Sequence, residues 1–452
     1  MEKPSLREFF NLLEKENKAL RIKEEVSVKF EIPFITKKLE PYKAVMFEKV
    51  KEAKIPVVAG ICGSRERICR ALNINEEKLY DKILEALKNP LKTKIVEDGE
   101  VKEVKEKPNL KKFPILIHYD GDKYPYITSA IISAKNPDNE EVENVSIHRL
   151  QVLDEKHLAI RIVPRHLYKL CQIAKDKGKN TLDIAISIGN HPAILLAASS
   201  PAPFGVSEFD VANRMLNGEL KLIECENVNA RAPANSEIIF EARILLNKLV
   251  EEGPFVDITG TYDAVRLQPL VEVVNVLRRS DCIYQALIPA GFEHKLLMGL
   301  AREAKIWEAV RNVVPTVKAV RLTDGGCGWL HVVISLKKQI EGDSKNAILA
   351  AFSAHPSVKH VIVVDEDIDV DNLSMVEWAL ATRFQADEDL IIIKNVRGSS
   401  LDPSAEQETG LTCKAGFDAT IPLNKPKEKF EKAKIPENQK VKDILSKLNF
   451  KI

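Results

Sequence analysis

Apolar residues recur at helical spacing near the start of the chain and at strand-like spacing soon after it. Residues 5–20 place apolar side chains three and four positions apart, which predicts an amphipathic helix. The runs VMFEKV (45–50) and IPVVAGIC (55–62) predict strands, and a second helix is expected from about Arg65. This order predicts a small α/β unit.

A charged stretch at 98–114 interrupts this pattern. It contains two prolines and little apolar periodicity, so we expect a connector that runs over the surface. Strand-like runs follow at 126–134, 144–154 and 157–164, and a helical pattern that begins at His166 and stops near Gly178 covers 166–179. We therefore predict a first domain over 1–114 and a strand-rich second domain over 115–310.

The last third of the chain returns to an alternation of helices and strands. Residues 294–314 form a long amphipathic pattern, and VKAVRLT, HVVISLK and HVIVVDEDID then alternate with helical segments. This predicts a third, α/β domain over 311–452. Its Lys-rich end, 424–452, has one short helical pattern that either packs on another subunit or is a solvated tail.

Charge and cysteine content narrow the class of protein. The 67 Lys and Arg nearly balance the 66 Asp and Glu, so no net field attracts nucleic acid or an anionic membrane. The opening residues are charged rather than signal-like, and no apolar run is long enough to span a bilayer. The seven cysteines are scattered and lack zinc-site spacing, which is typical of reduced thiols. We therefore expect a cytoplasmic protein.

The segment EGPFVDITGTY sets two carboxylates, Glu252 and Asp257, on either side of a Gly-Pro pair. An odd separation on a straight strand sends side chains to opposite faces, so joint action needs a bend, which Gly-Pro can supply. If both acids face one apolar pocket, burial and mutual repulsion keep one of them a proton donor near neutral pH. The alternative is a polar loop with two solvated acids.

A second group of residues offers mixed metal ligands and a cation. Asn144, His166 and Glu208 supply an amide oxygen, an imidazole and a carboxylate, with Arg149 close by in sequence. Such ligands suit Mn²⁺ or Mg²⁺ better than structural zinc, and an ion held there could clamp a phosphate. The alternative for His166 is a helix-start residue whose ring is satisfied by backbone.

Other candidates favour structural roles. The segment DGGCGW (324–329) lacks the strand, GxGxxG and helix arrangement of a dinucleotide site, so we interpret it as a turn. Cys327 within this turn has no base partner in sequence and is expected to be a small packed residue. His355 and His360 flank a predicted strand without the HExxH spacing of a metal site, and we interpret both as structural.

Several contiguous motifs, in order along nearly the whole chain, resemble the UbiD family of reversible decarboxylases. They are GSRER (63–67), NVSIHRLQVL (144–153), RIVPRH (161–166), PAPFGVSEFDVA (201–212), PANSEIIFE (233–241), EGPFVDITGTY (252–262) and LDPSA (401–405). Chance agreement over so many ordered blocks is far less frequent than for a single short pattern.

The resemblance implies a cofactor and its ligands. Asn144, His166 and Glu208 match the family positions for Mn²⁺ or Mg²⁺ bridging to the phosphate of prenylated FMN, and a monovalent cation, usually K⁺, is implied nearby. The flavin-contacting strands of the family are matched by Ile147, His148, Arg149, Arg161, Ile162 and Val163. His148 stands where many members carry an aromatic residue.

The same resemblance implies catalytic roles and an architecture. Arg149, Glu252 and Asp257 match the family's Arg-Glu-acid network, with Asp257 in the proton-donor position that other members fill with glutamate. The implied fold is α/β (α+β, multidomain): an N-terminal α/β domain, a central split β-barrel similar to flavin reductases, and a C-terminal α/β domain that helps to form a homodimer or higher oligomer.

Within the family, this length and a composition rich in Lys, Glu and Ile resemble archaeal members that convert trans-anhydromevalonate 5-phosphate to isopentenyl phosphate in isoprenoid synthesis. The expected activity is therefore non-oxidative decarboxylation of an α,β-unsaturated, phosphorylated acid. A separate flavin prenyltransferase is implied as supplier of the cofactor. The alternative within the family is an aromatic, hydroxybenzoate-type acid decarboxylase, and outside it a flavin oxidoreductase or flavin carrier.

Overall fold

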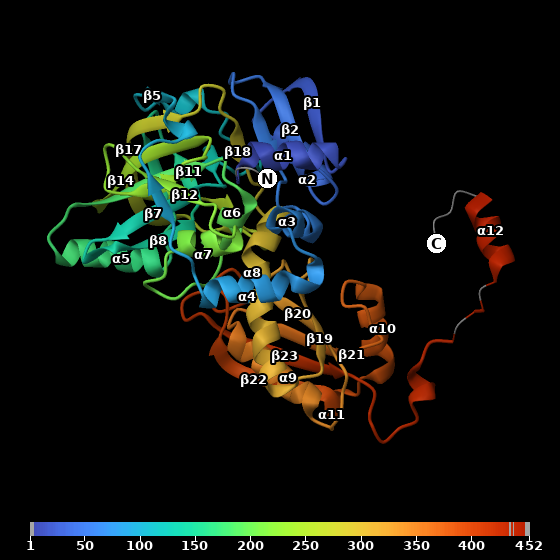
Figure 1. The fold of residues 1–452 in the computed structure, drawn as a ribbon. Helices are drawn as coiled ribbons and strands as arrows, with labels where there is room; N and C mark the ends of the chain where they lie inside the picture. Colours follow the sequence, from blue (N-terminus) through green and yellow to red (C-terminus); the bar gives the residue numbers. More distant parts are fainter. Residues whose placement is uncertain (1–3, 434, 437, 448–452) are drawn as a thin grey trace.

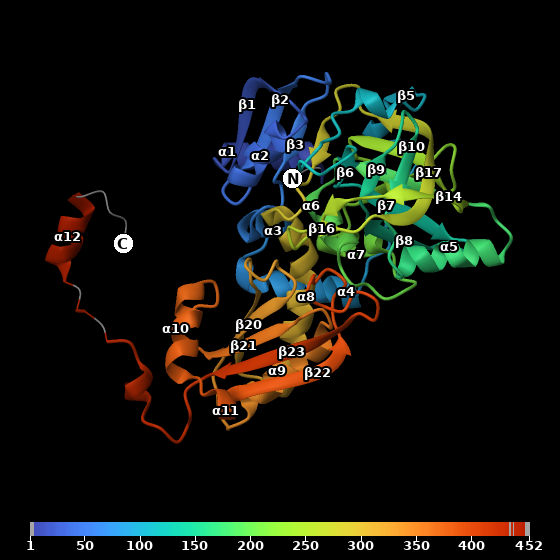
Figure 2. The same cartoon turned by 180° about the vertical axis from the view of Figure 1, so that it is seen from behind.

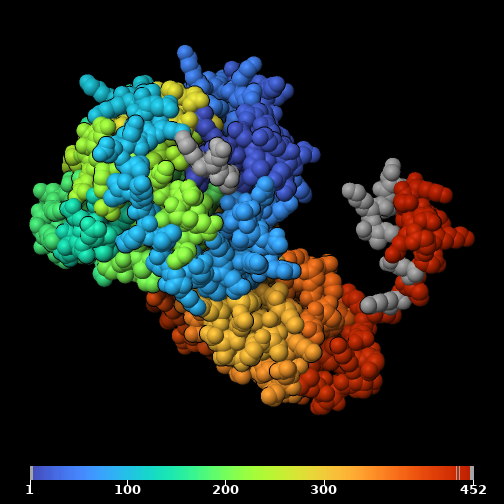
Figure 3. Space-filling view, in the orientation of Figure 1, coloured from blue at the N-terminus to red at the C-terminus, as the bar shows by residue number. Residues whose placement is uncertain are grey.

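The computed structural model describes residues 4–433, 435–436 and 438–447. Two adjoining units, drawn blue and cyan to yellow in Figure 1, form the larger mass, and an orange to red C-terminal unit lies beneath them. The space-filling view shows these parts in contact with one another (Figure 3). The mixture of helices and several sheets confirms the predicted α/β class.

The N-terminal unit is a four-stranded sheet covered by helices. Its strands are, in hydrogen-bonded order, β1 (Ala19–Val26), β2 (Ala44–Val50), β3 (Val57–Ala59) and β18 (Tyr284–Ala286). Its helices are α1 (Leu6–Lys15), α2 (Glu31–Leu39), α3 (Arg65–Leu72) and α4 (Leu79–Lys88). The helix predicted over 5–20 is shorter than expected, because the chain turns at Asn17, which has a φ of 58°, and enters β1 at Ala19.

The central unit contains a nine-stranded sheet. Along its main path the order is β6 (Tyr126–Ile127), β9 (Leu150–Val152), β10 (His157–Ile160), β17 (Arg266–Arg278), β14 (Ile238–Glu252), β11 (Thr181–Ile188), β7 (Ile131–Asn136) and β8 (Asn139–Ile147). The ninth strand, β5 (Val104–Glu106), pairs with β17. This pairing corrects the prediction of a plain connector at 98–114, since residues 104–106 form a strand that pairs with one end of β17.

Smaller elements complete the central unit. The strands β4 (Lys94–Val96), β12 (Lys221–Glu224) and β13 (Arg231–Pro233) form a three-stranded sheet, and β15 (Phe255–Val256) pairs with β16 (Tyr262–Asp263). The helices are α5 (His166–Asp176), α6 (Pro192–Ala198) and α7 (Glu208–Met215). Single-turn 3-10 helices occur at Glu76–Lys78, Glu100–Lys102, Leu110–Lys112 and Lys427–Phe430.

The central sheet is strongly curled. β8 is the last strand of the path and β9 is the second, yet only His148 and Arg149 separate them in sequence. Three Cα steps span at most about 11 Å, whereas six strand spacings in a flat sheet would cover roughly 29 Å. The two edges of the sheet must therefore approach each other, and His148 and Arg149 cross the gap between them.

The C-terminal unit is a five-stranded sheet with helices packed on it. The strand order is β19 (Val317–Leu322), β20 (His331–Leu336), β21 (His360–Asp365), β23 (Leu411–Ala419) and β22 (Leu390–Arg397), with parallel pairing from β20 through β23. Its helices are α9 (Asp343–Ala354), α10 (Leu373–Arg383) and α11 (Ala386–Asp389). This confirms the predicted alternation of helices and strands.

One long helix, α8 (Phe292–Val313), joins the units (Figures 1 and 2). Its first half buries Leu297 and Leu300 in the core shared with the N-terminal and central units. Its second half buries Ile306 and Val310 in the core of the C-terminal sheet. Side chains presented by α8 are therefore positioned at the seam between the central and C-terminal units.

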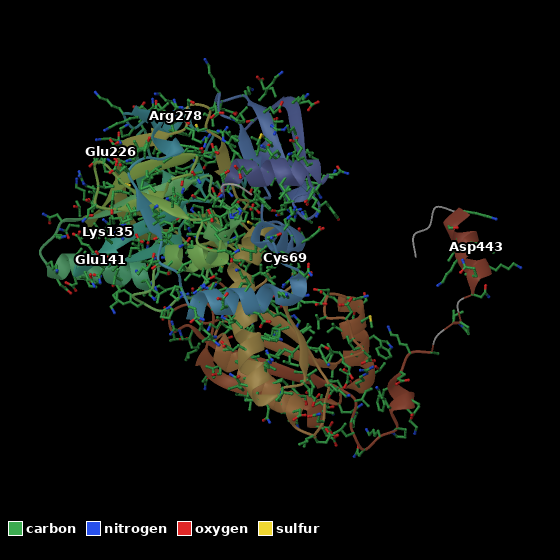
Figure 4. All side chains as sticks on the ribbon, viewed as in Figure 1. Cys69, Lys135, Glu141, Glu226, Arg278 and Asp443 are labelled. Atoms are coloured by element: carbon green, nitrogen blue, oxygen red, sulfur yellow. The ribbon has the colours of Figure 1, made fainter. Side chains whose placement is uncertain are left out.

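The helix α12 (Gln439–Lys447) stands away from the rest of the chain (Figure 4, with Asp443 labelled). All its described residues are at least partly exposed, including Val441 and Ile444.

Candidate active site

Arg149 lies where the chain crosses from one edge of the central sheet to the other, and it binds three carboxylates. Its Nε and Nη2 donate to the two oxygens of Glu252 at 2.8 and 2.9 Å, its Nη1 donates to Asp257 at 2.8 Å, and its Nη2 also donates to Asp263 at 3.0 Å. The guanidinium carbon is 4.5 Å from the centre of the Phe255 ring. A bidentate, stacked arginine of this kind is held in one orientation.

The predicted bend between the two acids is present. β14 ends at Glu252, and Gly253 then adopts a φ of 107°, which favours glycine, before the chain turns into the β15–β16 hairpin. Asp257 lies in the turn of this hairpin, where the Ile258 N–H donates to its Oδ1 at 2.7 Å. The side chain of Glu252 is fully buried, whereas that of Asp257 is 19% exposed. The solvated-loop alternative is therefore wrong.

Asp263 is a third acid that sequence reasoning missed. It lies in β16, forms an ion pair with Arg266, and is 3.8 Å from the Arg161 guanidinium. Burial alone would raise the pKa of Asp263, but its hydrogen bond to Arg266 and the charge of Arg149 outweigh burial and lower it. Asp263 thus shares the Nη2 group of Arg149 with Glu252 and helps to hold the guanidinium in place. Asp263 lies in a polar segment of the sequence, and no local pattern there indicated this role.

A buried polar group supports Glu252 from behind. The Tyr126 hydroxyl donates to Gln151 Oε1 at 2.8 Å and lies 3.3 Å from Glu252 Oε1. Gln151 Oε1 also accepts from the Gly253 N–H at 2.8 Å. Tyr126 packs on Phe255, with ring centres 4.7 Å apart. The bend and the buried acid are therefore fixed by one hydrogen-bonded group.

His294, in the first turn of α8, is a further residue that the sequence did not reveal. The Ala290 N–H donates to its Nδ1 at 3.1 Å, so Nδ1 is unprotonated and the neutral ring carries its proton on Nε2. Burial lowers the pKa of His294, and the negative charge of Asp257 acts in the opposite direction. A neutral imidazole therefore lies within the electrostatic reach of Asp257.

The residues predicted to bind metal lie on β8 and on the two helices that contact it, α5 and α7. The Asn144 amide nitrogen donates to Ser146 Oγ at 3.2 Å, Ser146 Oγ lies 2.9 Å from His148 Nε2, and His148 Nδ1 lies 2.8 Å from the Arg161 carbonyl. Because a carbonyl only accepts, His148 Nδ1 is protonated, Nε2 accepts from the serine hydroxyl, and the serine accepts from Asn144. This chain turns the Asn144 carbonyl oxygen away from Ser146 and leaves it available.

Glu208 is joined directly to this strand. It begins α7, it is 4% exposed, and its Oε2 accepts from the Val145 N–H at 2.6 Å. Burial, with a smaller contribution from the nearby Glu143, raises the pKa of Glu208 to about 8. Glu143 is also buried, and its Oε2 has no hydrogen-bond partner. Neither carboxylate forms an ion pair with any residue that the structure describes.

His166 begins α5, which packs against β8. Its ring contacts Phe204 edge-on, with centres 5.4 Å apart. Burial and the charges of Arg165 and Lys169 lower the pKa of His166, which favours the neutral, ligand-competent imidazole. The imidazole makes no hydrogen bond within the described residues. The structure therefore brings Asn144 and Glu208 to neighbouring positions and places His166 on an adjacent helix.

An apolar strip lies beside Arg149. Ile147 and Ile162 are at least partly buried, whereas Val163 is 37% exposed, and the Ile162 N–H donates to Gln268 at 2.8 Å. The two segments that carry these residues meet where the Arg161 N–H donates to the Arg149 carbonyl. The two segments predicted to contact a flavin are thus joined at the sheet gap.

Two other findings bear on function. A cavity of about 650 Å³ lies among residues of α1, the end of α3 and Met215–Asn217, and none of its lining residues belongs to the Arg149 group. Over the chain described here, no helix combines the length and apolarity needed to cross a membrane.

Three domain profiles of one family match the chain. They are the N-terminal (residues 10–87), Rift-related (93–292) and C-terminal (295–419) domains of 3-octaprenyl-4-hydroxybenzoate carboxy-lyase, UbiD. Among curated proteins, anhydromevalonate phosphate decarboxylase of Methanothermobacter thermautotrophicus is 47% identical over 92% of this chain and 96% of its own length. Gallate decarboxylase of Lactiplantibacillus plantarum is 30% identical over 86% of each chain.

Solved structures agree with this match. The UbiD-class enzyme HmfF of Pelotomaculum thermopropionicum, in complex with FMN, is 44% identical with a TM-score of 0.92, over 96% of this chain and 97% of that one. An evolved dimeric form of the same enzyme, in complex with prFMN, is 41% identical with a TM-score of 0.89 over the same shares.

Proposed function

This chain belongs to the UbiD family of carboxy-lyases, and from that premise we propose that it decarboxylates trans-anhydromevalonate 5-phosphate to isopentenyl phosphate with prenylated FMN. The Arg149 group carries the proposal. One guanidinium holds a buried acid and a partly exposed acid side by side, which supplies both a carboxylate anchor and a proton donor at one place.

The difference in exposure assigns the two roles. Glu252 is fully buried and bonded to Arg149 on both oxygens, so it cannot reach a bound substrate. Asp257 is partly exposed, and its Oδ2 meets only one N–H of Arg149. We therefore assign Asp257 as the group that protonates the substrate carbon after CO₂ leaves, and Glu252 as the residue that positions Arg149.

Arg149 has one donor to spare. Four of its N–H groups are engaged with Glu252, Asp257 and Asp263, which leaves one on Nη1 beside Asp257. A substrate carboxylate can accept a hydrogen bond from this remaining N–H. To accept from both N–H groups of Nη1, the substrate carboxylate must displace Asp257. Such a displacement would free Asp257 for proton transfer at the moment when the substrate is oriented.

Prenylated FMN, when bound, supplies the electron sink that decarboxylation requires. The apolar strip of Ile147, Ile162 and Val163 fits a flat aromatic ring, and it lies directly beside Arg149. Arg161 adds a cation near Asp263 at this edge. By covering the reacting carbon, these apolar side chains would exclude water, so that Asp257 is the proton source.

The residues predicted to hold Mn²⁺ or Mg²⁺ also fit a cation. Glu208 and Glu143 are buried carboxylates that form no ion pair within the described residues, and no described residue hydrogen-bonds to the Asn144 carbonyl oxygen. The charges of Arg231 and Lys135 act on Glu143 from a greater distance. Ionisation of the buried Glu208 beside Glu143 is costly unless a further cation compensates the charge. We propose that Asn144, His166 and Glu208 hold the divalent ion at the cofactor's phosphate, with K⁺ nearby.

The direct test is CO₂ release by the cofactor-loaded protein. The chain is produced together with a flavin prenyltransferase, supplied with Mn²⁺ and K⁺, and offered trans-anhydromevalonate 5-phosphate or 4-hydroxybenzoate. We expect CO₂ and isopentenyl phosphate from the first and no CO₂ from the second. Release from hydroxybenzoate alone would favour the aromatic alternative, which the 30% identity to gallate decarboxylase motivates. NADH oxidation with FMN and no CO₂ would instead indicate a flavin oxidoreductase.

The curvature of the central sheet bears on the finer architecture of the chain. We propose that the curled central sheet is the split barrel expected for this family, because its two edges meet across His148 and Arg149, although its hydrogen-bonded path is open. The division into domains at 114 and 310 is likewise a proposal. α8 extends across the second of these positions.

We also propose an oligomeric state for this chain and the compartment in which it acts. The homologous HmfF is known in an evolved dimeric form, and we propose that this chain forms a homodimer or a higher homo-oligomer. We further propose that it acts in the cytoplasm and takes its prenylated flavin from a separate prenyltransferase. Size-exclusion chromatography with light scattering tests the first of these statements.

A further inference from the structure

Four basic side chains lie near one another at the seam between the central and C-terminal units, and we call them the basic cluster. They are Arg165 at the start of α5, Arg302 on α8, His355 at the end of α9 and Lys414 on β23. Arg302 and His355 pack on Trp329, and the charge of Arg165 acts on both. Figure 2 shows α8 between the central unit, which carries α5, and the sheet that contains β23. No step of the proposed mechanism uses these residues.

Arg302 is fixed at the centre of the seam without an acidic partner. Its Nη1 donates to the carbonyls of Ser199 and Met298 at 2.5 and 3.0 Å, and its guanidinium carbon lies 4.9 Å from the centre of the Trp329 ring. Burial, and then the charge of Arg165, lower the pKa of Arg302 to about 9. Two carbonyls and an aromatic ring therefore orient the guanidinium but do not neutralise it.

His355 and Lys414 approach the same place from the C-terminal unit. The His355 ring packs on Trp329 with centres 4.5 Å apart, it is 5% exposed, and its Nε2 has no hydrogen-bond partner. Lys414 is 4% exposed and donates only to the Pro356 carbonyl, at 2.6 Å. Burial, and then the fields of Arg302, Lys414 and Arg165, lower the pKa of His355 to about 3. A purely structural role for His355 does not explain why its Nε2 is buried without a hydrogen-bond partner among the described residues.

Three members of the cluster form no ion pair with a carboxylate anywhere in the described chain: Arg165, Arg302 and Lys414. Elsewhere in this protein, buried arginines such as Arg149 and Arg383 each meet two or more acids. Burial of like charges without a counter-ion costs several kcal/mol on the usual scale, so such a group persists where an anion completes it. The uncompensated positive charge at the seam therefore favours binding of an anion.

We propose that the basic cluster binds the phosphate group of the substrate. This inference rests on the proposed function and adds to it the residues that select a phosphorylated acid. Arginine presents planar donors to phosphate oxygens, and the unpaired His355 Nε2 and Lys414 Nζ can contribute further hydrogen bonds. Such a site binds a phosphate monoester through charge and shape rather than through its carbon skeleton.

The spacing along α8 suits a short phosphorylated acid. His294, which feels the charge of Asp257, and Arg302 are eight residues apart on the same helix, which corresponds to about 12 Å at 1.5 Å per residue. The hydrogen bond from Arg302 to the Met298 carbonyl shows that its side chain points back toward His294 by about one turn. A phosphorylated acid with a five-carbon main chain can therefore reach from the neighbourhood of Asp257 to the basic cluster.

The cofactor also carries a phosphate monoester, so the test must separate the two sources. Arg302→Met removes the central cation and keeps an apolar contact with Trp329. Arg311→Met is the matched control, because Arg311 lies on the same helix 4.8 Å from the centre of another tryptophan, Trp307, outside the cluster. Lys414→Met is a second variant of the cluster, on a different element.

The first readout is turnover and flavin content of the loaded proteins. In Arg302→Met and Lys414→Met, kcat/KM for trans-anhydromevalonate 5-phosphate should fall about 10- to 100-fold, mostly through KM, the loss typical of a hydrogen bond to a charged group. Turnover of the dephosphorylated acid, and the flavin-to-protein ratio, should be unchanged. Loss of flavin from these variants would assign the cluster to the cofactor and overturn the proposal, as would equal losses on both acids.

The second readout does not depend on turnover. Isopentenyl phosphate is titrated into the flavin-loaded wild type and variants in a calorimeter, with isopentenol as the uncharged comparison. We expect binding at least 10-fold weaker in Arg302→Met and wild-type binding in Arg311→Met. Equal binding by all three proteins overturns the phosphate site even if decarboxylation is observed. Selective weakening supports the site even if the proposed substrate proves wrong.

Discussion

Arg149 and Arg302 are both held against an aromatic ring, at 4.5 Å from Phe255 and 4.9 Å from Trp329, but their surroundings differ in charge. Arg149 meets three carboxylates, whereas within the described residues Arg302 donates hydrogen bonds to backbone carbonyls alone. The charge of Arg149 is therefore neutralised by carboxylates of the same chain, and Arg149 holds those acids in place. Arg302 is oriented but not neutralised, and its charge remains available to a ligand.

The comparison separates two uses of a buried cation. Removing a cation that compensates buried acids leaves those acids without a partner, which is strongly destabilising. Removing a cation that has no acidic partner relieves repulsion among like charges. The two arginines should therefore respond to the same substitution in opposite ways, and this can be tested without knowledge of the substrate.

The largest expected effect is on stability in Arg149→Met. This change leaves Glu252, which is fully buried, without a counter-ion, so the free energy of unfolding should fall by about 3–5 kcal/mol. Arg302→Met should change it by no more than about 1 kcal/mol, or increase it. Urea unfolding of the ligand-free proteins measures both. A loss of similar size in the two variants would contradict the distinction.

A smaller effect is expected where His148 orients Asn144. In His148→Ala the chain of hydrogen bonds from the Arg161 carbonyl through Ser146 is interrupted, so the Asn144 carbonyl oxygen is no longer fixed. Loss of an orienting partner typically lowers metal affinity 10- to 100-fold. Titration of Mn²⁺ monitored by electron paramagnetic resonance measures this change. His157→Ala, which removes an exposed histidine bound to Asp154, should leave the affinity unchanged.

Two buried acids, Glu40 and Glu293, lie close together, so here like negative charges rather than like positive charges are buried. Glu40 accepts from the Phe292 and Glu293 N–H groups at the start of α8, and burial, reinforced by Glu293, raises the pKa of Glu40 to about 7. Burial likewise raises the pKa of Glu293 to about 7. Because the folded state binds protons more tightly here than the unfolded state, stability is greatest below the unfolded pKa and is lost as pH rises toward 7.

The prediction from this pair is a pH slope. Between pH 5 and 7.5 the wild type should lose on the order of 2 kcal/mol of stability from each of these carboxyls, and Glu40→Gln should lose less over the same range. Unfolding at several pH values measures the slope. An identical slope in the two proteins would show that Glu40 does not titrate in this window.

The smallest expected effect is in Tyr126→Phe. The Tyr126 hydroxyl donates to Gln151, which also accepts from the Gly253 N–H, so its removal weakens the support of the bend but leaves the ion pairs of Arg149 in place. We expect a loss of about 1 kcal/mol in stability and a decrease in kcat of less than 10-fold. A complete loss of activity would give Tyr126 a direct part in the chemistry.

The sequence predicted the order of elements well, because strand and helix periodicities are local properties. The runs at 45–50 and 157–164 became β2 and β10, and the 166–179 pattern became α5. The connector at 98–114 was misjudged, because β5 forms only through pairing with the distant β17. Long-range pairing of this kind leaves little trace in a short charged segment.

The candidate site was predictable only in part. Glu252 and Asp257 share a short motif with a visible bend signal, so their meeting could be anticipated. Asp263 and His294 reach the same place through the β15–β16 hairpin and the start of α8, which no local pattern reveals. The basic cluster draws on four elements, and its significance lies in the lack of ion pairs between its cations and any described carboxylate, which only a structure can show.

The most direct test of the central claim compares two acids on the same guanidinium. Asp257→Asn and Asp263→Asn each remove one negative charge from Arg149, but only Asp257 is assigned to proton transfer. Single-turnover decarboxylation of trans-anhydromevalonate 5-phosphate is measured in flavin-loaded proteins. We predict a rate lower by about 10²- to 10⁴-fold in Asp257→Asn, with flavin content retained, and a much smaller decrease in Asp263→Asn. Equal rates in the two variants would contradict the assignment of Asp257 as the proton donor.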